Sequence, residues 1–188
     1  MEEKVFAPYD RVVKFLLPII PKRLTPNQIT FFRLVMVPVL IAFLILEDYR
    51  IALPLFIVLA LTDVLDGSLA RLRDQITAWG KIWDPIADKL LIGSVVVVLL
   101  LRVNIILTIL LLIFEAMFII GGAFNLAARN THIQANKWGK IKMNLQVVGA
   151  ALLILGLVIG SDKILFSGEC ILYVSLLFSV VSLFKKGI

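Results

Sequence analysis

The stretch that limits the possible folds runs from residue 51 to residue 102 and reads IALPLFIVLALTDVLDGSLARLRDQITAWGKIWDPIADKLLIGSVVVVLLLR. It holds two long apolar runs joined by a short polar connection, with Asp63 and Asp66 before the connection and Asp84 and Asp88 after it. A helix that crosses the hydrocarbon core of a bilayer needs roughly 20 mostly apolar residues. We therefore expect two antiparallel membrane helices here, at about 51–71 and 84–102.

The same criterion applied to the whole chain predicts six membrane spans. They fall at about 27–47, 51–71, 84–102, 105–127, 142–161 and 164–184. Arg102 and Asn104 interrupt what would be one very long apolar run, which favours a tight hairpin outside the bilayer. Six spans and short connections use all of residues 1–188, so we expect one all-α membrane domain and no soluble domain.

Composition leads to the same class of protein. Of the 188 residues, 61% are hydrophobic and 17% are charged, which excludes an ordinary water-soluble globule and a disordered chain. A single cysteine, Cys170, excludes a protein built on intrachain disulfides. We interpret the net charge of +6 as a sign that basic residues contact lipid headgroups on one face of the membrane, and we expect no nucleic-acid partner.

The distribution of basic residues predicts the orientation. With a cytoplasmic N-terminus, 16 of the 19 Lys and Arg residues lie at the inner side, and only Arg50, Arg102 and Lys163 lie outside. This bias indicates that both termini are cytoplasmic. Arg33, on the first span, is expected near the inner headgroups, where it could contact phosphate.

Residues 1–22 are expected to form an amphipathic helix on the inner leaflet, since apolar and charged residues alternate at helical spacing. The first span should begin directly after it. Thr25 is a suitable N-cap, Pro26 suits the first helical position, and Gln28 completes a capping box.

The four aspartates are the candidate functional residues of the chain. Asp63 and Asp66 share one helix face at spacing i,i+3, and Asp84 and Asp88 share another at i,i+4. Because their helices are antiparallel neighbours, the two pairs can face each other within the inner leaflet. Four carboxylates in a medium of low dielectric constant need compensating positive charge.

Arg71 and Lys89 are candidates for part of that charge, and one or two divalent cations could supply the rest. Oxygen ligands select hard cations, so Mg²⁺ or Mn²⁺ is expected, with open positions for phosphate oxygens. From spacing alone a metal-phosphate enzyme is favoured over an ion or proton transporter, which remains the alternative of another class.

At these residues the sequence resembles the CDP-alcohol phosphotransferase family. The family signature, D-x2-D-G-x2-A-R-x8-G-x3-D-x3-D, is matched at every fixed position from Asp63 to Asp88. The family also has six spans, an amphipathic N-terminal helix and a Pro-Asn-x-x-Thr start to the first span, which Pro26 to Thr30 reproduce.

The resemblance implies a role for each residue of the signature. Asp63, Asp66, Asp84 and Asp88 would hold the divalent metal on the diphosphate of CDP-diacylglycerol, and Asp88 would also be the general base. The residues expected to border the nucleotide are Asn27, Gly67, Ala70, Arg71 and Gly80. The implied reaction attaches a phosphatidyl group to an alcohol and releases CMP. The resemblance also suggests a homodimer, and we expect it in a prokaryotic plasma membrane with its active site facing the cytoplasm.

The acceptor alcohol is harder to identify. The basic residues expected to bind an anionic acceptor are Arg129, Lys137, Lys140 and Lys142. Gly139-Lys140-x-Lys142 with Gln146 is similar to a segment of the phosphatidylglycerophosphate synthase branch, which favours glycerol 3-phosphate. Met143 stands where that branch usually has Thr, and Phe114-Glu115 where it has Arg-Glu.

These departures leave inositol phosphate or another polar alcohol open as the acceptor. Membrane anchoring by the positive-inside rule is an equal alternative for any single lysine of the basic segment. Glu115 is expected to be an inter-helix hydrogen-bond partner rather than a pocket residue.

Overall fold

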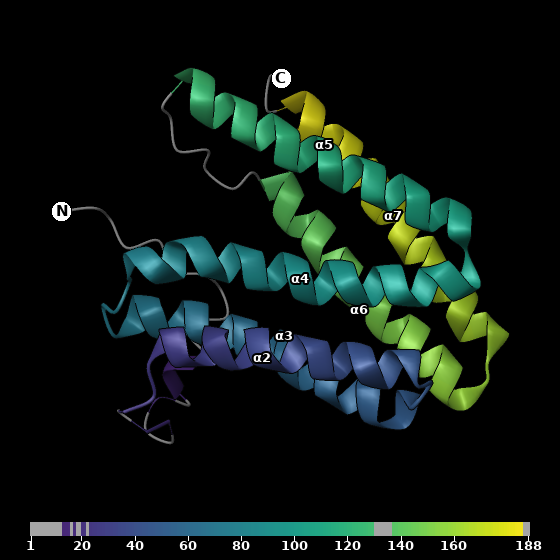
Figure 1. Ribbon diagram of the computed structural model, residues 1–188, viewed down its shortest axis with the longest axis horizontal. Helices are drawn as coiled ribbons and strands as arrows, with labels where there is room; N and C mark the ends of the chain where they lie inside the picture. The colour runs from purple at the N-terminus through teal and green to yellow at the C-terminus, as the bar shows by residue number, and fades with distance from the viewer. Residues whose placement is uncertain (1–12, 16, 18–19, 22, 130–136, 186–188) are drawn as a thin grey trace. The chain divides into compact units, whose positions relative to one another are not determined.

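A computed structural model describes residues 13–15, 17, 20–21, 23–129 and 137–185, without the side chains of 81, 118–119, 121–129, 137 and 183–185. Over these ranges the protein is helical and contains no strand, as predicted (Figure 1). The long helices are α2 (Pro26–Ile45), α3 (Tyr49–Leu72), α4 (Ala78–Val103), α5 (Ile105–Arg129), α6 (Lys137–Ile159) and α7 (Asp162–Lys185).

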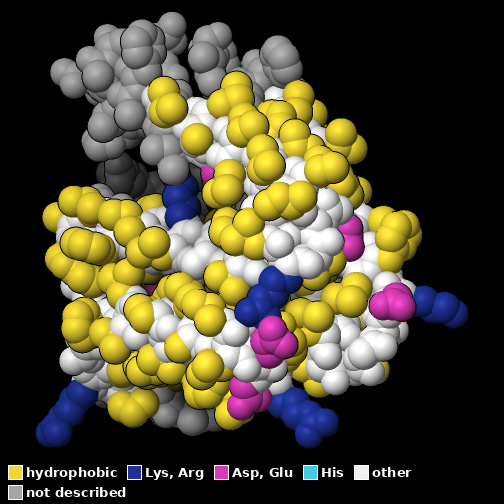
Figure 2. Space-filling view, turned by 45° about the vertical axis from the view of Figure 1, so that its right-hand side comes forward, with side chains coloured by type: hydrophobic (Ala, Val, Ile, Leu, Met, Phe, Trp, Pro, Cys, Tyr) yellow, Lys and Arg dark blue, Asp and Glu magenta, His cyan; other side chains and the backbone are white. Residues whose placement is uncertain are grey.

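Several of these helices are suited to a membrane. Within the described residues, α2, α3, Trp138–Ile159 of α6 and Asp162–Ser182 of α7 are long and apolar enough to cross one. Helix α5 is apolar over Ile105–Met117, and α4 carries two aspartates and three basic residues along its 26 residues. Hydrophobic side chains cover much of the face seen in Figure 2. The prediction of an all-α protein with several membrane helices is therefore confirmed.

The beginning of α2 follows the predicted capping box. The Thr25 side chain accepts a hydrogen bond from the backbone N–H of Gln28 (3.4 Å), and the Gln28 side chain accepts one from the backbone N–H of Thr25 (3.0 Å). Pro26 occupies the first turn, where its missing N–H costs no helical hydrogen bond. This cap defines where the Asn27 to Arg33 face of α2 starts.

Helix α4 begins earlier than the predicted span because Thr77 caps it. The Thr77 hydroxyl accepts a hydrogen bond from the backbone N–H of Gly80 (2.9 Å), which satisfies one donor of the first turn. Residues 78–83 before Asp84 are therefore helical, so Gly80 and Asp84 lie one turn apart on the same face.

The predicted hairpin at Asn104 is also present. Helix α4 ends at Val103 and α5 starts at Ile105, with Asn104 between them. The Asn104 side chain accepts a hydrogen bond from the backbone N–H of Leu107 (3.1 Å) and donates one to Glu169 Oε2 of α7 (2.7 Å). Asn104 therefore both closes the turn and ties it to α7.

The chain divides into two compact units, Met1–Ser94 and Val95–Ile188. In the first unit α2 packs along α3, and the apolar part of this core is formed by fully buried side chains such as Leu40, Leu44, Phe56 and Leu59. The guanidinium of Arg73 donates to the backbone carbonyls of Leu24 (2.8 Å) and Ile20 (3.0 Å). This contact fixes the α3–α4 connection against the segment that precedes α2.

In the second unit α6 and α7 form a closely packed pair, and α5 also contacts α7. Glycines allow the close approach: a Cβ added to Gly149 would lie 2.7 Å from Leu172 Cγ, and one added to Gly156 would lie 2.8 Å from Leu165 Cγ. Gly160 has φ +71° in the turn between the two helices, a conformation that glycine adopts without strain.

The predicted interfacial helix at 1–22 falls largely outside the described residues. The part that is described includes a helical turn at Val13–Phe15, with Val13 buried and Phe15 exposed.

Candidate active site

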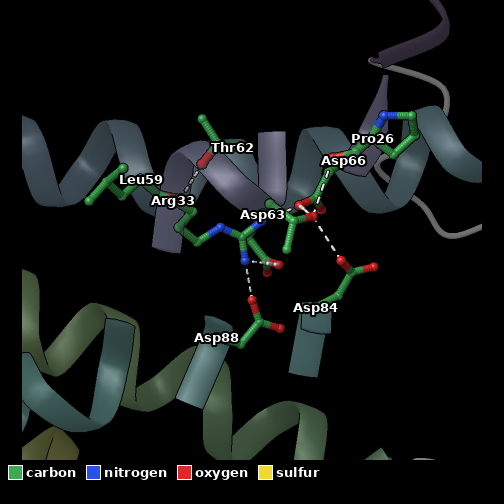
Figure 3. A network of polar contacts seen from close by, with 9 residues as sticks. Pro26, Arg33, Leu59, Thr62, Asp63, Asp66, Asp84 and Asp88 are labelled. Carbon is green, nitrogen blue, oxygen red and sulfur yellow. Dashed lines mark hydrogen bonds and ion pairs between the residues drawn. The ribbon is translucent and has the colours of Figure 1, made fainter. Parts of the chain in front are cut away.

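The four aspartates of the sequence signature converge within the first unit. Asp63 and Asp66 extend from α3, and Asp84 and Asp88 extend from α4 toward them (Figure 3). Asp66 is almost completely buried, with 2% of its surface exposed, and the others are partly buried. The predicted arrangement of two facing carboxylate pairs is therefore present.

Arg33 of α2 lies in the middle of this cluster and is completely buried. Its Nη1 donates to Asp63 Oδ1 (2.7 Å) and to Asp88 Oδ1, and its Nη2 donates to Asp66 Oδ2 (Figure 3). One guanidinium thus pairs with three carboxylates from two helices. The compensating positive charge at the centre of the site is therefore that of Arg33, which we expected from the sequence only near the inner headgroups. Lys89, one of the residues predicted to supply this charge, is exposed.

Thr30, one turn before Arg33 on the same face of α2, completes the contacts. Its buried hydroxyl oxygen lies 2.7 Å from Asp84 Oδ1 and 3.0 Å from Asp66 Oδ2. A hydroxyl has one proton, so it donates to one of these carboxylates at a time. Thr30 and Arg33 were not among the predicted site residues; an Arg i,i+3 from a Thr within an apolar span is the signal that could have identified them.

Two predicted nucleotide-binding residues, Asn27 and Gly80, lie together beside the cluster. Asn27 Oδ1 accepts a hydrogen bond from the Thr77 hydroxyl (2.9 Å). A Cβ added to Gly80 would lie 3.2 Å from Thr77 Oγ1, 3.3 Å from Asn27 Oδ1 and 3.4 Å from Asp84 Oδ2. Gly80 therefore allows α2 and α4 to approach closely at this end of the site.

A hollow of about 350 Å³ adjoins these residues, lined by Asn27, Gln28, Phe31 and Trp79. Trp79 stacks on Trp83, with ring centroids 5.8 Å apart. The remaining predicted nucleotide residues, Gly67, Ala70 and Arg71, are half-buried on α3. A Cβ on Gly67 would be in ordinary contact with the Arg71 guanidinium, 3.5 Å from Nη1.

The carboxylates have the donor chemistry of a site for a hard divalent cation, and their convergence on a cationic group fits such an ion. Among the described residues, however, no three acidic, histidine or cysteine side chains are arranged to hold a metal as they lie. The reason is visible in Figure 3: Asp63, Asp66 and Asp88 are directed at the guanidinium of Arg33. The residues therefore fit a metal ion in charge and ligand type, provided that the guanidinium gives up some of its contacts.

The predicted acceptor residues belong to the second unit. Lys140 is exposed on α6, whereas Lys142 is buried and forms an ion pair with Glu115 Oε1 of α5. Gln146 Nε2 donates to the same Glu115 oxygen (3.1 Å), so Glu115 is the inter-helix hydrogen-bond partner that was predicted. The side chains of Arg129 and Lys137 lie outside the described part of the chain.

Comparison with known proteins shows one family that matches the chain over most of its length. A family model described as CDP-alcohol phosphatidyltransferase matches residues 23–181. A Rickettsia felis protein named CDP-diacylglycerol–glycerol-3-phosphate 3-phosphatidyltransferase is 35% identical over 163 residues, which are 84% of this chain and 90% of the relative. A Cereibacter sphaeroides protein with the same name is 36% identical over 140 residues, 70% of this chain and 63% of the relative.

A more distant relative shares a shorter region. The human cardiolipin synthase (CMP-forming) is 45% identical over 69 residues, covering 36% of this chain and 23% of that protein. The family match extends over most of the chain, from the start of α2 into α7, and includes all four converging aspartates. This chain is a member of the CDP-alcohol phosphatidyltransferase family.

Proposed function

We propose that this protein transfers the phosphatidyl group of CDP-diacylglycerol to the hydroxyl of glycerol 3-phosphate and releases CMP. The observation that carries the proposal is the convergence of Asp63, Asp66, Asp84 and Asp88 from two helices within a family of this chemistry. Relatives that align with most of the chain are named for the glycerol 3-phosphate reaction. The same family membership favours an enzyme over an ion transporter.

We infer that the four aspartates hold one or two Mg²⁺ or Mn²⁺ ions. When bound, such ions neutralise the charge of the donor's diphosphate and of the departing CMP. The protein's contribution is a set of carboxylates already gathered on α3 and α4, so little reorganisation of the backbone is needed. The residues proposed to border the nucleotide are Asn27, Gly67, Ala70, Arg71 and Gly80.

Asp88 is proposed as the general base. Its carboxylate accepts the proton of the acceptor hydroxyl as that oxygen forms a bond to the phosphorus that carries diacylglycerol. The bond from this phosphorus to the oxygen bridging to CMP breaks, and the electron pair leaves with CMP. Asp88 then passes its proton to the surrounding water, which restores the carboxylate. The Asp88 side chain is 18% exposed and that of Asp63 is 31% exposed, so the carboxylate of Asp88 is not closed off from solvent.

For the acceptor we propose that Lys140, Lys142, Arg129 and Lys137 attract the phosphate of glycerol 3-phosphate. Lys142 is held in place by its ion pair with Glu115 Oε1, which fixes the position of its ammonium group on α6. The buried Lys142–Glu115 pair is close to neutral, so among the described residues we assign most of the net attraction to Lys140, which is exposed.

The membrane arrangement completes the proposal. We propose six spans formed by α2 to α7, preceded by an interfacial helix at residues 1–22, with both termini and the active site on the cytoplasmic side of a prokaryotic plasma membrane. The acyl chains of the donor would then enter from the inner leaflet. We also propose that the enzyme is a homodimer.

A CMP-release assay tests the reaction. Purified full-length protein is supplied with CDP-diacylglycerol and, separately, glycerol 3-phosphate, inositol phosphate, inositol or serine. We expect CMP only with glycerol 3-phosphate, loss of turnover with a chelator, and recovery with Mg²⁺ or Mn²⁺. CMP release that requires a different acceptor would refute the glycerol 3-phosphate assignment, and no CMP with any acceptor would refute the enzyme assignment.

A further inference from the structure

Arg33 is the only described residue whose charge contacts three of the four aspartates directly. Its side chain is completely buried, and its contacts come from both α3 and α4. Burial of a charge without compensation costs several kcal/mol. Arg33 and the aspartates therefore stabilise one another in the protein without metal.

The same contacts stand in the way of a metal ion. The guanidinium uses Asp63 Oδ1, Asp66 Oδ2 and Asp88 Oδ1, which are oxygens that a divalent cation would require as ligands. A cation bound to these oxygens would lie within a few ångströms of the guanidinium, where like charges repel strongly because water is largely excluded. The two positive groups cannot both keep these contacts.

The guanidinium is also incompletely hydrogen-bonded. Arg33 Nε is buried and has no hydrogen-bond partner among the described residues. An unsatisfied buried donor lowers the stability of the arrangement in which it occurs. The ion-pair cluster is therefore held less firmly than its three contacts suggest, and a competing cation needs less energy to break it.

We propose that Arg33 is an internal countercation that competes with the divalent metal for the aspartates. Without metal its single positive charge offsets part of the negative charge of the four aspartates and preserves the fold. Metal binding requires the guanidinium to release the carboxylate oxygens that the metal takes as ligands, so Arg33 weakens the affinity of the protein for the metal. This inference rests on the metal site of the proposed function.

Mn²⁺ binding to the purified full-length protein tests the competition directly. Free Mn²⁺ is followed by its EPR signal for the wild type, Arg33→Met, Arg33→Lys and the control Arg50→Gln, which removes an exposed positive charge at the start of α3. We expect Arg33→Met to bind Mn²⁺ at least about tenfold more tightly than the wild type, equivalent to losing one hydrogen bond to a charged group. Arg33→Lys should be intermediate, since one ammonium cannot span three carboxylates, and Arg50→Gln should match the wild type.

Thermal unfolding in detergent provides a second measurement. Arg33→Met should unfold at a lower temperature than the wild type in chelator, and Mn²⁺ should raise its midpoint more than that of the wild type. If Arg33→Met is obtained as folded protein only when Mn²⁺ is present throughout purification, the proposal is also supported. The proposal is overturned if the Mn²⁺ affinity is unchanged or weaker in both Arg33 variants. Arg33 would then have no effect on metal binding or would favour it.

The two proposals fail in distinguishable ways. If the wild type releases CMP in a Mn²⁺-dependent reaction while the Arg33 variants bind Mn²⁺ no more tightly, only the countercation role is wrong. If neither the wild type nor any Arg33 variant binds Mn²⁺, with or without CDP-diacylglycerol, the metal site itself is wrong and the countercation role falls with it.

Discussion

The α2–α3–α4 region of the first unit and the α6–α7 pair of the second unit are both apolar outside but are held together differently. Between α2, α3 and α4 the interior contains Arg33, Asp66 and Thr30, all buried. Between α6 and α7 it contains glycines facing leucines, with Gly149 against Leu172. One region is joined by charge and hydrogen bonds, and the other by the fit of small residues to large ones.

The difference separates function from stability. Small residues allow membrane helices to approach and gain dispersion contacts, which is a sufficient reason for the glycines of α6 and α7. Buried ion pairs are weak evidence for stability, because desolvation offsets much of their attraction. A cluster of four aspartates and one arginine in an apolar helical unit is therefore better explained by a role in binding or catalysis than by a contribution to stability.

The largest expected effect comes from breaking the charged region at Asp88. Asp88→Asn keeps the shape of the side chain but removes the proposed base, so CMP release should fall by about 10²- to 10⁴-fold. The initial rate is measured at saturating Mg²⁺. Asp162→Asn, which changes an exposed aspartate at the start of α7, is the control and should retain activity. An Asp88→Asn enzyme with wild-type turnover would remove the base assignment.

A smaller effect is expected at Thr30, which joins α2 to the carboxylates by hydrogen bonding alone. Thr30→Val preserves shape but removes the hydroxyl that donates to Asp84 or Asp66, which should cost about 1.5–3 kcal/mol of unfolding free energy. Denaturation by SDS in mixed micelles measures the difference. Thr30→Ser keeps the hydroxyl and should lose much less. Equal losses in the two variants would show that the methyl group matters and the hydrogen bond does not.

The glycine-packed region should respond to volume instead of charge. Gly149→Ala would place Cβ 2.7 Å from Leu172 Cγ and 3.3 Å from the carbonyl oxygen of Gly168, so we expect about 1–3 kcal/mol of destabilisation. Gly93→Ala is the matched control, because no atom lies within 4 Å of a Cβ added there. It should be neutral or stabilising. If both variants unfold alike, close packing is not what holds α6 to α7.

The smallest expected effect tests the edge of the charged region. Thr77→Ala removes the cap of α4 and the hydrogen bond to Asn27, which should cost about 1 kcal/mol of stability. Thr77→Ser retains both contacts and serves as the control for the same SDS titration. A Thr77→Ala protein as stable as the wild type would indicate that packing around Gly80 fixes the start of α4 without the cap.

Local patterns predicted much of the fold. The Thr25 to Gln28 capping box and the Asn104 hairpin were both predicted from sequence, because caps and tight turns depend on neighbouring residues. Helix α4 begins at Ala78, before the predicted span at 84–102, because the Thr77 hydroxyl caps its first turn. Span prediction follows apolar length, so it does not locate the helical turns that precede the apolar part of a helix.

By itself, the sequence determined the helical membrane class and the spacing that places Asp63 with Asp66 and Asp84 with Asp88, because helix periodicity is a local property. Only the tertiary structure decided which positively charged side chain forms ion pairs with these aspartates. Arg33 is 30 residues from Asp63 and 55 from Asp88 in the chain, and α2 brings it to both. Electrostatic attraction acts through space between packed helices, so the composition of such a cluster is set by how α2 lies against α3 and α4.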